Sequence, residues 1–205
     1  MRHSKTMEVI MQRSLLFSLL GCLLLAVAPV NLAQAQTDKE AKIKNAMSAA
    51  PPSIAAKATI MDWPAEEGGD TSVLRKGSND WTCFPDMPGK AGTSMCLDAP
   101  WLEWVDAWVN KREPNITTMG FGYMLQDPSV GESNTDPYAT GPTDDNEWIE
   151  DSVPHLMILV PDSKALEGMT TDPDNGGPWV MWKGTPYVHI MAPMPEYVPR
   201  EGHSR

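Results

Sequence analysis

Two histidines and two methionines near the end of the chain share a repeated spacing. His155 and Met157 stand one residue apart in HLMILV, and His189 and Met191 repeat the arrangement in YVHIMAPM. Imidazole nitrogen together with thioether sulfur suits copper, because polarisable sulfur favours Cu(I) and nitrogen accommodates Cu(II). These four residues are therefore candidate copper ligands.

The same residues also fit ordinary packing, since methionine is a common filler of protein cores. Side chains alternate along a strand, so in each segment the histidine and methionine fall on one face and aliphatic residues on the other. We expect the aliphatic faces to enter the main core, and the His/Met faces to form either a second packed layer, under a tryptophan-rich helix, or a partly open surface. The packed layer is favoured, so no cofactor is expected, with copper as the alternative.

Histidine-based catalysis would have to use the same two positions, because His203 lies in the C-terminal tail. A small hydrolase or lyase would pair His155 or His189 with an acid from the loop Asp144 to Glu147. The chain has no Gly-rich phosphate loop, no G-x-S-x-G motif and no H-E-x-x-H zinc motif. The sequence therefore favours a non-catalytic protein and keeps this enzyme as a further alternative.

Residues 1–35 have the features of a signal peptide. Basic residues precede an apolar run from Ser14 to Val30, and residues 33–35, AQA, provide a small-x-small cleavage signature. The run is too short for a membrane span and no second run follows. Lipid attachment at Cys22 is disfavoured, because an apolar stretch follows it. We expect a periplasmic or secreted protein with no integral membrane span.

Two cysteines follow this segment, Cys83 and Cys96, 13 positions apart around a Pro/Gly-rich loop. In an oxidising compartment such a pair predicts one disulfide. The spacing is not Cys-x-x-Cys, and the pair lacks partners at the spacing of a zinc site, so redox and zinc functions are disfavoured.

The chain beyond the signal segment has about 170 residues, enough for one domain with a proper core. The signal segment holds three of the 16 basic and one of the 27 acidic residues, so the remainder carries 13 against 26 and a net charge of −13. A nucleic-acid partner is disfavoured, because binding phosphates needs the opposite balance. We expect a small molecule or a periplasmic protein as the partner, and the pattern specifies no oligomeric state.

The pattern of elements predicts a single α+β domain on a mainly antiparallel sheet, with one Trp-rich amphipathic helix and long loops. Residues 36–60 indicate an N-terminal helical arm, residues 61–194 the globular domain and residues 195–205 a flexible tail. The clearest helix is DAPWLEWVDAWVNKR, with Asp98 as N-cap and three tryptophans on one stripe. Strands are predicted in SVLRKG, NDWTCF, NITTMGFGYML and VPHLMILVP, and a hairpin in WVMW and YVHIM.

Several unusual stretches, among them WTCFPDMPG, NTDPYATGP and GGPWVMWKGTPYVHIM, resemble those of a group of exported bacterial proteins of unknown function. The resemblance covers most of the chain and implies a periplasmic or secreted setting, but no activity, cofactor or catalytic residue. A partial resemblance to periplasmic copper chaperones is confined to the two His-x-Met elements and does not reproduce that family's overall spacing. The sequence as a whole predicts an exported accessory or binding protein.

Overall fold

The structure is a computed structural model that describes residues 28–66, 68–126, 130–150 and 152–194. The predicted signal segment, apart from residues 28–35, and the predicted tail, 195–205, lie outside the described residues. The chain divides into two compact units, Met1–Ala41 and Lys42–Arg205. Among the described residues no helix combines the length and the apolar character that crossing a membrane requires.

Helix α2 (Ala28–Met47) begins in the first unit and ends in the second. Residues 34–41 of the helix are exposed, and side-chain hydrogen bonds one turn apart join Gln34 to Asp38 and Gln36 to Glu40. Such pairs support an exposed helix by a few tenths of a kcal/mol each. The helix, which is described from Ala28, begins earlier than the predicted helical arm.

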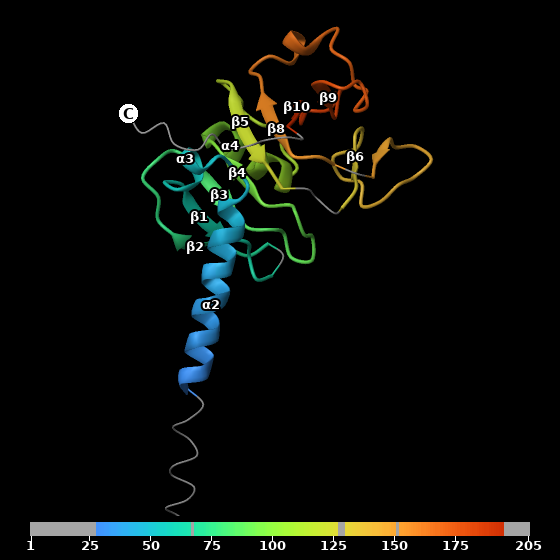
Figure 1. Ribbon diagram of the computed structural model, residues 1–205. Coiled ribbons are helices and arrows are strands. Elements are labelled where there is room, and N and C mark those ends of the chain that lie inside the picture. Colours follow the sequence, from blue (N-terminus) through green and yellow to red (C-terminus); the bar gives the residue numbers. More distant parts are fainter. Residues whose placement is uncertain (1–27, 67, 127–129, 151, 195–205) are drawn as a thin grey trace, which may run out of the picture. The chain divides into compact units, whose positions relative to one another are not determined.

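Eight strands of the second unit form one sheet, in the order β2-β1-β3-β4-β5-β8-β10-β9 (Figure 1). Neighbouring strands run antiparallel except β1 and β3, which run parallel. This arrangement confirms the predicted α+β class with a mainly antiparallel sheet. The strands are β1 (Thr59–Asp62), β2 (Ser72–Arg75), β3 (Thr82–Phe84), β4 (Met95–Leu97), β5 (Gly120–Met124), β8 (His155–Leu159), β9 (Trp179–Met181) and β10 (His189–Pro193).

The remaining described elements are short, apart from the Trp-rich helix α4 (Ala99–Val109). They are helix α3 (Pro52–Ala55), the 3-10 helix η1 (Ser163–Leu166) and a two-stranded sheet of β6 (Glu132–Ser133) and β7 (Trp148–Ile149). The two-stranded sheet is absent from the predicted strands, because strands of two residues leave no alternating pattern to detect.

The strands predicted in SVLRKG and NDWTCF exist as β2 and β3, but they are not paired with each other. Strand β1 lies between them, antiparallel to β2 and parallel to β3. The sequence of β1, TIMD, is too short to show a period-two pattern, which is why the strand is absent from the predicted elements.

One face of the sheet packs against an alanine-rich segment. Cys83 on β3 lies directly opposite Cys96 on β4, with the Cα atoms 4.0 Å apart, and the two form the predicted disulfide. They are buried with Ile60 of β1 against Ala46 and Ala49, at and just beyond the end of α2. Because alanine side chains are small, the backbone of this segment lies close to the sheet and the residues between them are buried.

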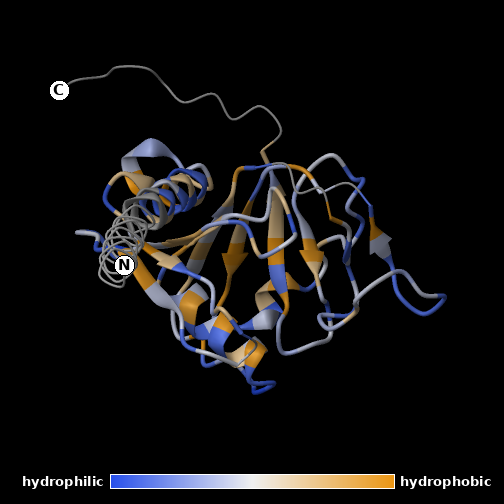
Figure 2. Ribbon diagram, turned by 90° about the horizontal axis from the view of Figure 1, so that it is seen from below, coloured by the Kyte–Doolittle hydropathy of each residue, from blue (hydrophilic) through white to orange (hydrophobic). Residues whose placement is uncertain are grey.

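The other face carries the larger core and is covered by helix α4. Asp98 caps the helix as predicted, its carboxylate accepting a hydrogen bond from the backbone N–H of Trp101 at 3.1 Å. Trp101 and Trp104 are buried against methionine and leucine side chains of the central strands. Two glycines of β5 allow this approach, since a Cβ atom on Gly120 would lie only 2.8 Å from Cβ of Pro100. In Figure 2 hydrophobic residues, in orange, are concentrated in the strands of the sheet.

In β8 and β10, the face that enters the main core is the opposite of the one expected from the sequence. Met157, Leu159 and Met191 belong to the main core, whereas the aliphatic Ile158 and Ile190 of the opposite face are only half-buried. The prediction that the aliphatic faces enter the main core is therefore wrong. Of the two alternatives for the His/Met faces, the packed layer under the Trp-rich helix is the one observed.

Candidate functional site

The four His-x-Met residues lie on one face of two neighbouring strands. Strands β8 and β10 pair antiparallel, with Met157 directly opposite Met191 and His155 opposite Pro193. In this register the two histidines lie toward opposite ends of the strand pair, with the two methionines between them. All four side chains are buried, each less than a tenth exposed.

The imidazole of His189 is enclosed by aromatic rings. The rings of Trp101, Trp104 and Trp182 stand edge-on to it, with centroid distances of 5.2 to 5.5 Å. Its Nδ1 atom is hydrogen-bonded to the carbonyl oxygen of Tyr187 at 3.0 Å. A carbonyl oxygen only accepts, so Nδ1 carries the proton and the lone pair is on Nε2.

His155 has the same local arrangement, with Nδ1 bonded to the carbonyl oxygen of Val153 at 2.6 Å. Burial lowers the pKa of both histidines, and it brings the pKa of His189 to about 4, with a further lowering from the nearby His155. Both rings are therefore neutral at neutral pH.

Neither histidine meets an acid in the described part of the chain, where no hydrogen bond or ion pair joins an imidazole to a carboxylate. In the loop proposed to supply the acid, Glu147 instead accepts a hydrogen bond from Asn134, and Asp144 is exposed. The arrangement brings no general acid or base to either ring.

A stack of aromatic rings leads from this layer to the surface. The Trp104 and Trp182 rings are nearly parallel, 5.6 Å apart, and the Trp108 and Tyr138 rings lie 6.1 Å apart at an angle of 4°. Trp104 is buried, whereas Tyr138 is 41% exposed. Offset parallel stacking is a favourable geometry for aromatic side chains, so the stack extends the core outward.

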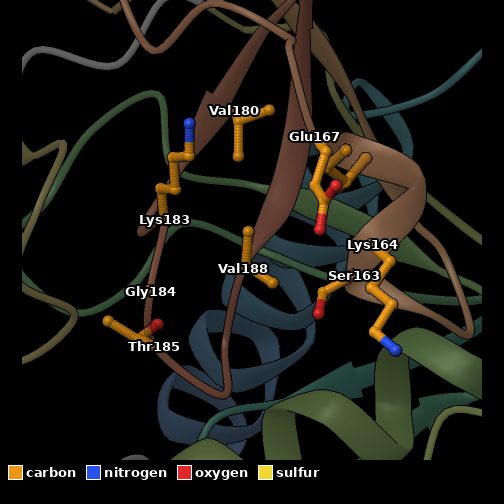
Figure 3. Close-up of a pocket in the computed structure, with 9 residues that line it drawn as sticks. Ser163, Lys164, Glu167, Val180, Lys183, Gly184, Thr185 and Val188 are labelled. Atoms are coloured by element: carbon orange, nitrogen blue, oxygen red, sulfur yellow. The ribbon is translucent and has the colours of Figure 1, made fainter.

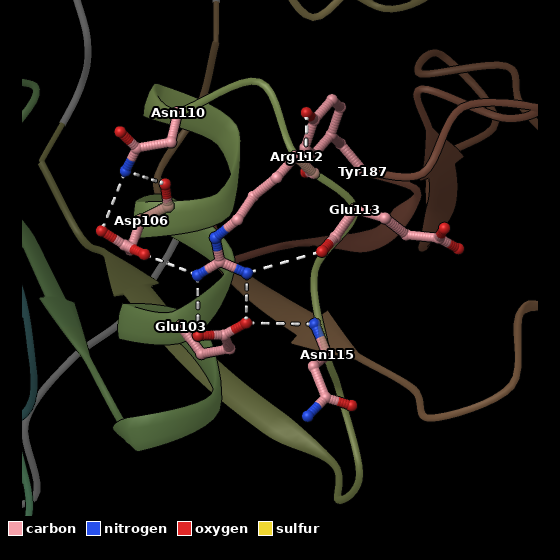
Figure 4. Close-up of polar contacts among 7 residues, drawn as sticks. All are labelled: Glu103, Asp106, Asn110, Arg112, Glu113, Asn115 and Tyr187. Atoms are coloured by element: carbon pink, nitrogen blue, oxygen red, sulfur yellow. Dashed lines mark hydrogen bonds and ion pairs between the residues drawn. The ribbon is translucent and has the colours of Figure 1, made fainter.

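A polar cluster holds the C-terminal end of α4 (Figure 4). The guanidinium of Arg112 bridges Glu103 and Asp106, and the hydroxyl of Tyr187 donates to the carbonyl oxygen of Arg112 at 3.0 Å. The hydrogen bonds from Arg112, joined by one from the backbone N–H of Asn115, lower the pKa of Glu103 to about 2. This cluster fixes the end of α4 and, through Tyr187, its position against the residues that lead into β10.

An accessible pocket lies on the opposite side of β9 and β10, between η1 and the turn that joins these strands. Its volume is about 370 Å³, at the small end of the range of ligand pockets. Figure 3 shows Lys183 on one side, Ser163, Lys164 and Glu167 on the other, and valines between them. The apolar lining is Leu166, Val180 and Val188.

The sequence did not indicate this pocket, because its polar residues are common surface types from two turns 20 residues apart. The available signal was limited to the two lysine-containing turns, SKALEG and WKGTP, that flank β9. Their closeness in space depends on the pairing of β9 with β10, which composition does not encode.

We found no protein-family model, curated protein or solved structure that matches this chain. The likeness to exported bacterial proteins stays a prediction. Among the described residues, no group of three or more His, Cys, Asp or Glu side chains could hold a metal ion. A copper site would therefore depend on the methionine sulfur atoms.

Proposed function

We propose that this protein is an exported, non-catalytic binding protein whose ligand occupies the pocket between η1 and the β9–β10 turn. The observation that carries the proposal is the lining of this pocket. Its floor is aliphatic and its rim carries hydroxyl, ammonium and carboxylate groups, the combination by which proteins bind and orient small ligands. The disulfide and the signal-like N-terminus support export.

The surroundings of the polar side chains support a non-catalytic role. His155 and His189 are enclosed and neutral, and neither lines the pocket. Within the described residues the hydroxyl of Ser163 forms no hydrogen bond with a basic side chain, and the hydroxyl of Thr185 donates to the carbonyl oxygen of Trp182, so neither hydroxyl has a base that would activate it. Binding, rather than bond cleavage, is the chemistry that these groups favour.

Backbone amide NMR spectra recorded with a library of small polar and amphipathic compounds test this proposal. We expect ligands to shift the signals of residues 163–167 and 180–188. Val188→Trp, which fills the pocket, should abolish these shifts, whereas Val73→Trp on the exposed edge strand β2 should leave them unchanged. Ligands recovered chemically unchanged after long incubation fit a binding role. Turnover of a ligand, or shifts that persist in Val188→Trp, would contradict it.

A second candidate function, copper binding, is favoured by the histidine tautomers. Both imidazoles donate through Nδ1 to a backbone carbonyl, the arrangement by which proteins orient a histidine whose Nε2 binds a metal. The paired Met157 and Met191 would supply sulfur for Cu(I). Cu(I) competition titrations should show uptake that a Met157→Leu/Met191→Leu variant of similar core volume loses. Equal uptake by both proteins would exclude this site.

A further inference from the structure

A row of apolar side chains crosses the sheet on the same face as the pocket. The strand register places Val180 of β9 next to Ile190 of β10, Ile190 next to Ile158 of β8, and Ile158 next to Phe121 of β5. Val180 is part of the pocket lining, so the row begins inside the pocket. Four strands at the usual spacing give the row a length of about 14 Å.

This row is partly accessible to solvent, because Val180 is buried whereas the other three side chains are at least partly exposed. The alanine-rich segment covers the same face over β1, β3 and β4, where Ile60, Cys83 and Cys96 lie, and extends to Tyr123 of β5, while helix α4 covers the opposite face. Ile158 and Ile190 are half-buried, and Phe121 at the far end is 37% exposed. A partly exposed aliphatic row therefore leads from the pocket across the sheet.

The charged groups at the pocket end favour an anion. Lys164 and Lys183 both line the pocket and neither forms an ion pair with a described residue, whereas the pocket contains one carboxylate, Glu167. This local excess of positive charge contrasts with the net charge of −11 for the whole chain. The acidic remainder of the surface repels an anion, whereas the ammonium groups of the two lysines attract it. An anionic ligand is therefore favoured at this end of the apolar row.

We infer that the ligand is a single-chain amphiphile with a carboxylate head, held with its head between Lys164 and Lys183 and its aliphatic chain along the row from Val180 to Phe121. This inference rests on the proposed function, because it specifies the ligand of the same pocket. The chain must be long enough to leave the pocket and contact Phe121. Each further methylene buried along the row adds to the affinity until the row ends.

The test is a series of NMR titrations with hexanoate, octanoate and decanoate, each below its micelle concentration. We expect the dissociation constant to fall at least fivefold from hexanoate to decanoate, with shifts that extend from residues 180–188 to residues 156–158 and 121. Phe121→Ser should reduce the gain from the longer chain, whereas Val73→Ser on the remote edge strand should not.

Charge variants test the head group. Lys164→Gln/Lys183→Gln should weaken decanoate binding at least fivefold, Glu167→Gln should strengthen it, and the matched double variant Lys57→Gln/Lys90→Gln, at exposed positions outside the pocket, should change nothing. Decyltrimethylammonium, with the same chain and a cationic head, should bind more weakly than decanoate.

The outcomes separate this inference from the proposed function. If library compounds occupy the pocket while decanoate does not, or if the cationic amphiphile binds equally well, the ligand class is wrong and the binding function stands. Binding only to phosphatidylglycerol vesicles, with no effect of monomeric decanoate, would likewise overturn the inference. If no compound of either set perturbs residues 163–167 and 180–188, both proposals fail.

Discussion

The imidazole of His189 stands edge-on to the indole of Trp104, with ring centroids 5.5 Å apart and planes at 81°. This contact places an ionisable ring inside an aromatic core. Because burial lowers the pKa of His189 to about 4, the unfolded chain, with a histidine pKa near 6.5, binds a proton first on acidification.

Acidification should therefore destabilise the fold through His189. Its contribution is fully present above pH 6.5 and is lost as the pH falls toward 4, by up to about 3 kcal/mol. Urea denaturation at pH 7.5 and pH 4.5 measures this loss. His189→Leu should show a smaller loss between the two pH values, and an equal loss in both proteins would exclude His189 as its source.

Acidification should stabilise the fold through Glu132 on β6, the opposite of its effect through His189. Burial raises the pKa of its carboxyl to about 6, against a hydrogen bond with Ser152, so the folded protein binds this proton more tightly than the unfolded chain. Stability through Glu132 rises as the pH falls from 6 to 4.5. Glu132→Gln should therefore stabilise the fold by about 2 kcal/mol at pH 7.5 and by little at pH 4. Glu150→Gln, at an exposed position, is the control, and equal effects of the two changes would contradict this account.

Gly120→Ala should destabilise the contact between β5 and α4. The new Cβ atom would lie 2.8 Å from Cβ of Pro100 and 3.1 Å from Leu159, closer than side chains tolerate, so the first turn of α4 must shift. Overpacking of this kind costs about 1–3 kcal/mol. Gly141→Ala, where no atom lies within 4 Å, should leave the thermal midpoint unchanged. A Gly120→Ala protein as stable as the Gly141→Ala protein would show that the close packing is not required.

Reduction of the disulfide should lower stability without unfolding the sheet at once. Cys83 and Cys96 close a loop of 13 positions, and in the chain-entropy model this closure contributes about 3 kcal/mol. Urea denaturation with and without a reductant measures the difference. Cys83→Ala/Cys96→Ala should match the reduced protein and show no further response to reductant, and any remaining response would point to another oxidisable group.

Local signals in the sequence were strong enough to predict helix α4, strands β5 and β8, the β9–β10 hairpin and the disulfide. Helix α4 has a cap at Asp98 and a regular tryptophan stripe, and β8 has a continuous apolar run. Strand β1 was missed because four residues cannot show a period, and β6 and β7 because two cannot. Short elements form here because neighbouring strands supply their hydrogen bonds, and those neighbours are distant in sequence.

The orientation of β8 and β10 shows a different limit. The alternation correctly separates a His/Met face from an aliphatic face, but it does not show which face receives helix α4. Gly120 and Gly122 on β5 determine which face it is. Without side chains, they leave space on one face of the sheet for the bulky Trp101 and Trp104. The pocket was beyond prediction for a related reason, since Lys164 and Lys183 come to line one pocket only in the folded arrangement of β9 and β10.

The covalent link between Cys83 and Cys96 has a consequence for the chain that lies between them. Residues 85–94 connect two neighbouring strands in the middle of the sheet, and this loop has left-handed backbone conformations at both Gly89 and Gly92. A protease that cuts there would leave the two halves joined through sulfur, each still paired to the same neighbours. Such a nicked molecule would migrate as one band on a non-reducing gel and as two bands after reduction, while remaining folded in solution.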